Sequence, residues 1–115
     1  MTSSIDPRFK KGLELFNDRE FFECHEVIEA LWLETPSEDE YRDLYKGVIQ
    51  AAAAIYQWER GIPSGAKGLY RTSVVYLKKY APAALGLNVD ALVKGMDRYF
   101  KEPGTEKVPV VEYEE

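Results

Sequence analysis

The sequence predicts an all-α fold, a compact bundle of about five helices with an extended C-terminal tail. Apolar residues recur at three- and four-residue spacing through most of the chain, which is the period of an amphipathic helix. Proline, glycine and capping residues divide these stretches into segments of helical length, and no stretch before the tail alternates convincingly as a strand would. We therefore expect one helical domain over residues 1–104 and an extended or flexible tail over residues 105–115.

Prolines mark the first two helices. Asp6-Pro7 has the pattern of an N-cap followed by proline in the first turn, and the apolar spacing extends this helix to about Asn17. A second helix is expected from about Glu20 to Glu34. It ends at Thr35-Pro36, because a residue that precedes proline disfavours the helical conformation.

Three further helices are expected. Ser37 and Glu40 are spaced as a capping box, which predicts that a third helix opens there and ends near Arg60-Gly61. Its centre, residues 48–55, is apolar almost all round, so it should be covered by neighbours on several sides. The fourth helix is expected to start at Pro63-Ser64-Gly65 and to end near Tyr80-Ala81-Pro82. The fifth is expected to start after Asn88, a plausible N-cap, and to end at Pro103-Gly104.

The last ten residues read EKVPVVEYEE, and Pro109 weakens a strand assignment there. Two interpretations of this tail remain. The first is a frayed or loosely docked terminus. The second is an extended arm that packs Val110, Val111 and Tyr113 onto a partner subunit.

Composition narrows the classes of function. The chain has 115 residues, 45% of them hydrophobic, which suits one globular domain. Its 15 basic and 20 acidic side chains give a net charge of −5, which argues against nucleic acid or an anionic membrane as the main partner. No apolar run reaches a span of roughly 18 residues, the N-terminus lacks the apolar core of a signal peptide, and Cys24 is alone. We expect a cytoplasmic protein.

The second helix breaks its own pattern. At about 100° per residue, one apolar arc holds Phe21, Phe22, Cys24, Ile28, Leu31, Trp32 and Leu33, and the opposite face holds Glu23, Glu26 and Glu34. His25 and Glu29 fall inside the apolar arc, four residues apart on one face. A buried charge must be paired or neutralised, so the simplest expectation is a hydrogen-bonded His25–Glu29 ion pair.

Three interpretations of the pair are open. It fixes helix packing in a structural or interaction protein that forms a homodimer; it binds a small polar ligand; or it binds a metal. In a ligand pocket, Phe22 and Trp32 would be walls and Gln50, on the third helix, would be a buried amide that bonds to the pair. In an enzyme, His25 would be the general acid or base and Glu29 its orienting partner. The sequence favours a binding or structural role over an enzymatic one.

The metal interpretation, which would suit a metal-assisted hydrolase, is the weakest of the three, and we predict no cofactor. His25 and Glu29 supply two ligands, whereas metal sites usually need three or four. Asp43 or the thiolate of Cys24 would have to complete the set. Cys24 points about 100° away from His25 around the helix, which makes it a poor third ligand.

A family resemblance rests on three segments. They are Phe16-Asn17 with residues 21–29 (FFECHEVIE) and Trp32, then residues 47–53 (GVIQAAA), then Gly61 with Gly65-Ala66. In that order they resemble the motifs of the bacterial and archaeal domain-of-unknown-function family 309. The resemblance spans about Leu13 to Leu87 and places His25, Glu29 and Trp32 on motif positions. It implies a compact multi-helical fold and self-association, and it implies no assigned activity.

Overall fold

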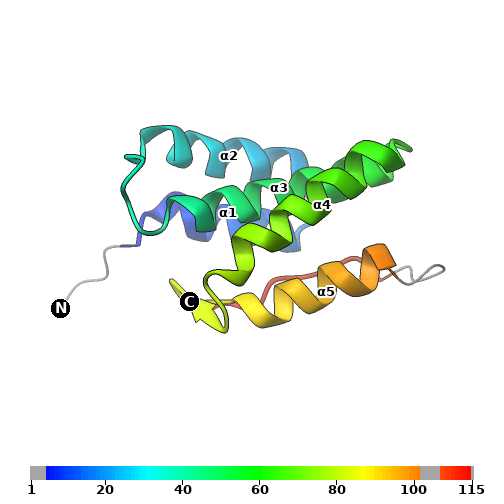
Figure 1. Ribbon diagram of the computed structural model, residues 1–115. Helices are drawn as coiled ribbons and strands as arrows, with labels where there is room; N and C mark the ends of the chain where they lie inside the picture. Colours follow the sequence, from blue (N-terminus) through cyan, green and yellow to red (C-terminus); the bar gives the residue numbers. More distant parts are fainter. Residues whose placement is uncertain (1–4, 102–106, 115) are drawn as a thin grey trace.

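The computed structural model describes residues 5–101 and 107–114. Its elements in chain order are α1 (Pro7–Asn17), α2 (Phe21–Glu34), α3 (Arg42–Glu59), α4 (Pro63–Lys78), β1 (Ala83–Ala84), β2 (Leu87–Asn88) and α5 (Val89–Lys101). The predicted all-α class is confirmed. The helices pack in chain order, each on the next, and α5 lies along one side of α4 (Figure 1). Among the described residues, no helix has the length and apolar content needed to cross a membrane.

The first helix begins where the sequence predicts. The Asp6 carboxylate accepts a hydrogen bond of 2.8 Å from the backbone N–H of Arg8, and Pro7 occupies the first turn. Phe9, Leu13 and Phe16 then point into the core and are at most 1% exposed. The cap and the apolar stripe therefore act together, because the cap fixes the helix start from which the spacing of the buried residues follows.

Replacing the cap tests this start. We expect Asp6→Ala to lower the free energy of unfolding by about 1 kcal/mol at neutral pH. The side-chain hydrogen bond from Arg8, followed by its backbone N–H, lowers the pKa of the Asp6 carboxyl. The ionised carboxylate thus stabilises the folded state above the pKa of an unfolded aspartate, and this contribution is lost as the pH falls through the lower, folded value.

Urea unfolding of the wild type and of Asp6→Ala should therefore give curves that differ at pH 7 and converge on acidification. Asp6→Asn keeps a capping acceptor and should retain most of the stability. Equal losses in Asp6→Asn and Asp6→Ala would contradict the capping account.

The predicted start of the third helix is wrong. Ser37 does not pair with Glu40; its hydroxyl donates to Glu38 Oε1 at 3.1 Å. Asp39 forms a turn in place of the capping box, because its carboxylate accepts a hydrogen bond of 2.8 Å from the backbone N–H of Tyr41. The helix begins only at Arg42. A short side chain that bonds its own backbone two residues on has displaced the capping box.

The centre of α3 is covered on more than one side, as predicted. It packs between α2 and α4, with Val48, Ala51, Ala52, Ala54 and Ile55 fully buried. Gly47 lies against Leu77 of α4, and its carbonyl accepts a buried hydrogen bond of 2.7 Å from the Ser73 hydroxyl. The small residues let the α3 and α4 backbones approach closely.

A two-stranded hairpin precedes α5, where the sequence showed no convincing strand. β1 and β2 pair antiparallel, with Ala83 opposite Asn88 and Ala84 opposite Leu87. Two residues per strand are too few to show the alternation by which a strand is recognised. The predicted N-cap is confirmed, since Asn88 Oδ1 accepts from the backbone N–H of Ala91 at 3.0 Å. The predicted stop at Pro103-Gly104 lies outside the described residues.

Residues 107–114 of the tail dock on their own chain, and they pack more closely than the frayed or loosely docked terminus of the first interpretation. An arm that packs on a partner subunit stays a prediction, because one chain does not test it. The tail runs back beside α5 to the hairpin (Figure 1). Val111 is 3% exposed, and Asn17 holds its backbone from both sides, accepting from its N–H at 2.7 Å and donating to its carbonyl at 2.9 Å. Tyr113 bridges to Leu87, while Val110 stays 58% exposed. Periodicity could not show this, because the docking depends on residues that lie far away along the chain.

Candidate functional site

The His25–Glu29–Trp32 row lies at the rim of the contact between α2 and α3. The buried face of α2 is narrower than the predicted arc and consists of Phe21, Cys24, Ile28 and Leu31. His25 and Glu29 keep 30% and 44% of their side chains exposed, so the predicted burial of the pair is wrong. The row follows the buried ridge by one residue, and that rotation carries it to the open edge of the helix.

The pair itself is loose. His25 Nε2 and Glu29 Oε1 are 3.7 Å apart, which is longer than a hydrogen bond. An ion pair exposed to this extent contributes about 1 kcal/mol or less, and only while the imidazole is protonated. Both side chains therefore keep hydrogen-bonding capacity that neither one uses on the other.

An aromatic cavity adjoins the histidine. Phe22 lies with its ring centroid 6.2 Å from that of His25 and 5.6 Å from that of Tyr56 on α3. A hollow of about 200 Å³ opens here, with Ala53 on its α3 side. Phe22 is 45% exposed, which is unusual for a phenylalanine that faces a neighbouring helix. The predicted wall residue thus lies next to His25, and Tyr56 is a further wall that helical spacing on α2 could not reveal.

Trp32 closes the other end of the row. The Arg42 guanidinium and the Lys46 ammonium lie 4.2 Å and 4.1 Å from the centre of its ring, both at cation–π distance. Both cations, one turn of α3 apart, therefore lie over the tryptophan. The spacing that puts Arg42, Lys46 and Gln50 on one stripe of α3 was visible in the sequence. The fact that this stripe faces α2 was not.

Gln50 lies at the middle level of the row but does not bond to the pair. Trp32 opposite Lys46 and Phe22 opposite Tyr56 fix an antiparallel register, which places Gln50 at the level of His25 and Glu29. Its side-chain carbonyl accepts from the Thr72 hydroxyl of α4 at 2.6 Å instead. That bond orients the amide and leaves its N–H groups to other acceptors. We call Phe22, His25, Glu29, Trp32, Lys46, Gln50 and Tyr56 together the α2–α3 seam.

The described residues offer no third metal ligand beside the pair. They contain no group of three His, Cys, Asp or Glu side chains placed to hold a metal ion. Burial raises the pKa of the Cys24 thiol to about 12, so it is not a thiolate at neutral pH. Asp43 pairs with Lys79, the residue that follows the last turn of α4. The metal-assisted hydrolase of the sequence analysis therefore finds no donor set in this part of the chain.

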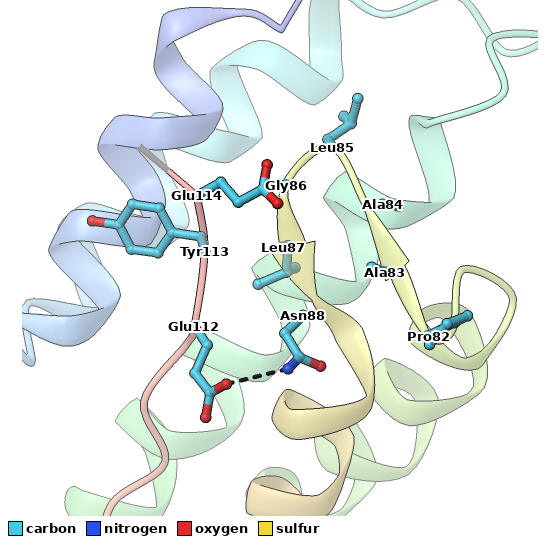
Figure 2. Close-up of a pocket in the computed structure, with 10 residues that line it drawn as sticks. All are labelled: Pro82, Ala83, Ala84, Leu85, Gly86, Leu87, Asn88, Glu112, Tyr113 and Glu114. Carbon is cyan, nitrogen blue, oxygen red and sulfur yellow. Dashed lines mark hydrogen bonds between the residues drawn. The ribbon is translucent and has the colours of Figure 1, made fainter.

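A larger hollow, of about 650 Å³, lies between the hairpin and the tail. Figure 2 shows it lined by the turn from Pro82 to Asn88 and by Glu112, Tyr113 and Glu114, with Asn88 donating to the Glu112 carboxylate. Short apolar side chains and backbone make up most of its surface. Two carboxylates of the tail, Glu112 and Glu114, have no cation among the residues that line the hollow, so the hollow offers less chemistry than the seam.

Comparison with known proteins supplies a family. A family model described as a domain of unknown function (DUF309) matches residues 9–69, which is more than half of the chain. The uncharacterized protein YpuF of Bacillus subtilis (strain 168) is 34% identical over 92 residues, an alignment that covers 78% of this chain and 52% of YpuF. The chain thus spans about half the length of that relative. The family match contains the seam and excludes α5 and the tail.

Proposed function

This chain belongs to the DUF309 family, and we propose that it is a small helical binding module that takes a small polar ligand at the α2–α3 seam. One observation carries the proposal. His25 and Glu29 are half-exposed and 3.7 Å apart, and His25 lines an aromatic hollow, so each of the two side chains offers a hydrogen-bonding group that the fold does not use.

The seam indicates which chemistry it would recognise. Glu29 accepts hydrogen bonds from hydroxyl or amino groups, and the imidazole of His25 both donates and accepts. A ligand that bridges the two would be polar and small, with one flatter, less polar side against Phe22 and Tyr56. The N–H groups of Gln50 would bind an acceptor on the same ligand.

The structural alternative draws less support from this geometry. A pair that fixes packing should be buried and hydrogen-bonded, because its removal is costly only when it leaves an uncompensated buried charge. His25 and Glu29 are neither. The homodimer and the cytoplasmic location predicted from the sequence stay predictions, because one chain tests neither of them.

The test is substitution of the pair. We expect His25→Gln and Glu29→Gln each to lower the free energy of unfolding by less than about 1 kcal/mol, because the pair is exposed and loose. A panel of small polyols, amino acids and amino sugars, screened by ¹H–¹⁵N chemical shifts, should give one class that shifts the seam residues. Either substitution should remove those shifts.

Glu23→Gln is the matched control, since Glu23 is an exposed carboxylate on the same helix, about 160° around the helix axis from His25. It should keep the ligand-induced shifts. The structural alternative would instead be supported by losses of about 3–5 kcal/mol in His25→Gln and Glu29→Gln with no compound bound by the wild type.

A further inference from the structure

A second groove lies between α4 and α5, away from the seam. It has a volume of about 530 Å³, within the range of small-molecule sites. Its floor is apolar. Tyr70 and Phe100 stack with ring centroids 4.9 Å apart, and Val74 and Val75 continue the surface along α4, with Val75 64% exposed.

Basic side chains surround this apolar floor. Lys67, Arg71 and Lys78 of α4 and Lys101 of α5 line the groove, against one carboxylate, Asp97. Four cations around one groove are unusual in a chain whose net charge is −5. The groove is therefore positively charged although the protein as a whole is negatively charged, and it attracts anions that the rest of the surface repels.

The lone carboxylate is already engaged. Asp97 accepts a hydrogen bond from the Tyr70 hydroxyl, and its oxygen lies 4.0 Å from Lys101 Nζ. By contrast, no acidic side chain of the described residues forms an ion pair with Arg71 or Lys78. Lys67 lies 5.9 Å from the ring centre of Trp58, at cation–π distance. The positive charge of the rim is thus largely uncompensated.

The register of α4 against α5 places most of the positive charge at one end of the groove. Because Tyr70 stacks on Phe100, Lys101 lies at the same level as Lys67 and Arg71. The apolar floor extends from that level along α4 toward Lys78. Lys67 and Lys78 are separated by about 16 Å at the helical rise per residue. The groove therefore has a cationic end and an apolar length.

From this arrangement we infer that the α4–α5 groove binds a small amphiphilic anion, with its acidic head at Lys67, Arg71 and Lys101 and its apolar body along Val74 and Val75. A peptide helix is disfavoured as occupant, because three of the four cations lie at one end and suit a single head group. The inference is independent of the seam, which lies on the other side of α3 and uses different residues.

Dodecanoate below its micellar concentration is the probe, and the two tryptophans of the chain are internal reporters. Trp58 packs edge-on against Phe100, with centroids 5.5 Å apart, whereas Trp32 lies in the seam. In ¹H–¹⁵N spectra we expect dodecanoate to shift the indole signal of Trp58 and the backbone signals of the groove, and to leave the Trp32 indole unchanged. Dodecanol and dodecyltrimethylammonium should bind much more weakly.

The variant Lys67→Gln/Arg71→Gln removes two of the three head-group cations, and neither of them forms an ion pair with a described residue, so the variant should fold normally. It should weaken dodecanoate binding by about fivefold or more. Lys11→Gln/Lys94→Gln removes the same charge elsewhere and should bind like the wild type. The inference is overturned if dodecanol binds as tightly as dodecanoate, or if both double variants lose affinity for dodecanoate equally. It is also overturned if dodecanoate shifts the indole signal of Trp32 instead of that of Trp58, or if only an amphipathic acidic peptide shifts the groove signals.

Discussion

Val111→Asp is expected to lower the free energy of unfolding by about 3–5 kcal/mol. Val111 is 3% exposed, and burial of a valine side chain contributes about 1.5–3 kcal/mol. Its backbone also exchanges two hydrogen bonds with Asn17, worth about 0.5–1.5 kcal/mol each. An ionised carboxylate at this buried position would lose its hydration. The chain can avoid burying it by releasing the tail, so the docking free energy of the tail limits the loss.

Val110→Asp is the matched control, because the neighbouring valine is 58% exposed. It should change the free energy of unfolding by no more than about 0.5 kcal/mol. Urea unfolding followed by circular dichroism measures both variants. Similar losses at the two positions would show that the tail does not dock through Val111.

A double variant identifies the mechanism of the loss. If Val111→Asp releases the tail, then Asn17 has already lost both of its partners, and adding Asn17→Ala should cost little more. The two effects should therefore be clearly less than additive. The tail's other anchors would be lost together with Val111. They are the hydrogen bonds from Asn88 N–H to the Glu112 carbonyl and from Glu114 N–H to the Gly86 carbonyl, 2.8 Å and 2.9 Å long.

The sequence predicted best what short-range interactions decide. Asp6-Pro7 and Asn88 mark helix starts because a cap needs only its own next few residues. The Ser37–Glu40 capping box failed at the same range, because Asp39 offered the backbone a competing turn. The Ser37 cap and the Asp39 turn are two competing local hydrogen-bond patterns, and the sequence pattern alone does not show which of them is more stable.

For the seam, too, the sequence predicted the local pattern on each helix but not the contacts between the helices. Helical periodicity correctly separated His25 and Glu29 from the acidic outer face of α2. It overestimated their burial, because the width of a buried face depends on which helices cover it. α3 covers only one side of the row, and its cations lie over Trp32 rather than in solvent. The stripe on α3 and the row on α2 were both visible, and only the fold brings them together.

Gly47→Ala is expected to lower the free energy of unfolding by about 1–3 kcal/mol, although alanine favours a helix over glycine by up to about 1 kcal/mol. A β-carbon at Gly47 would lie 2.8 Å from Leu77 Cδ2, 2.9 Å from Leu77 Cγ and 3.3 Å from the Leu77 backbone nitrogen. The end of the leucine can rotate, but its Cγ and its backbone cannot move without separating α3 from α4. Such a separation would also strain the buried hydrogen bond from Ser73 to the Gly47 carbonyl.

Gly68→Ala makes the same chemical change on α4 with the opposite expected sign. A β-carbon at Gly68 would meet no atom within 4 Å, so only the helix propensity acts, and stability should rise by about 0.5–1 kcal/mol. Thermal and urea unfolding of the two variants should therefore move in opposite directions from the wild type. A stabilised Gly47→Ala would mean that α3 and α4 are not in close contact at this point. In that case the α3 stripe that faces the seam would also lack the support that α4 gives it through Thr72 and Gln50.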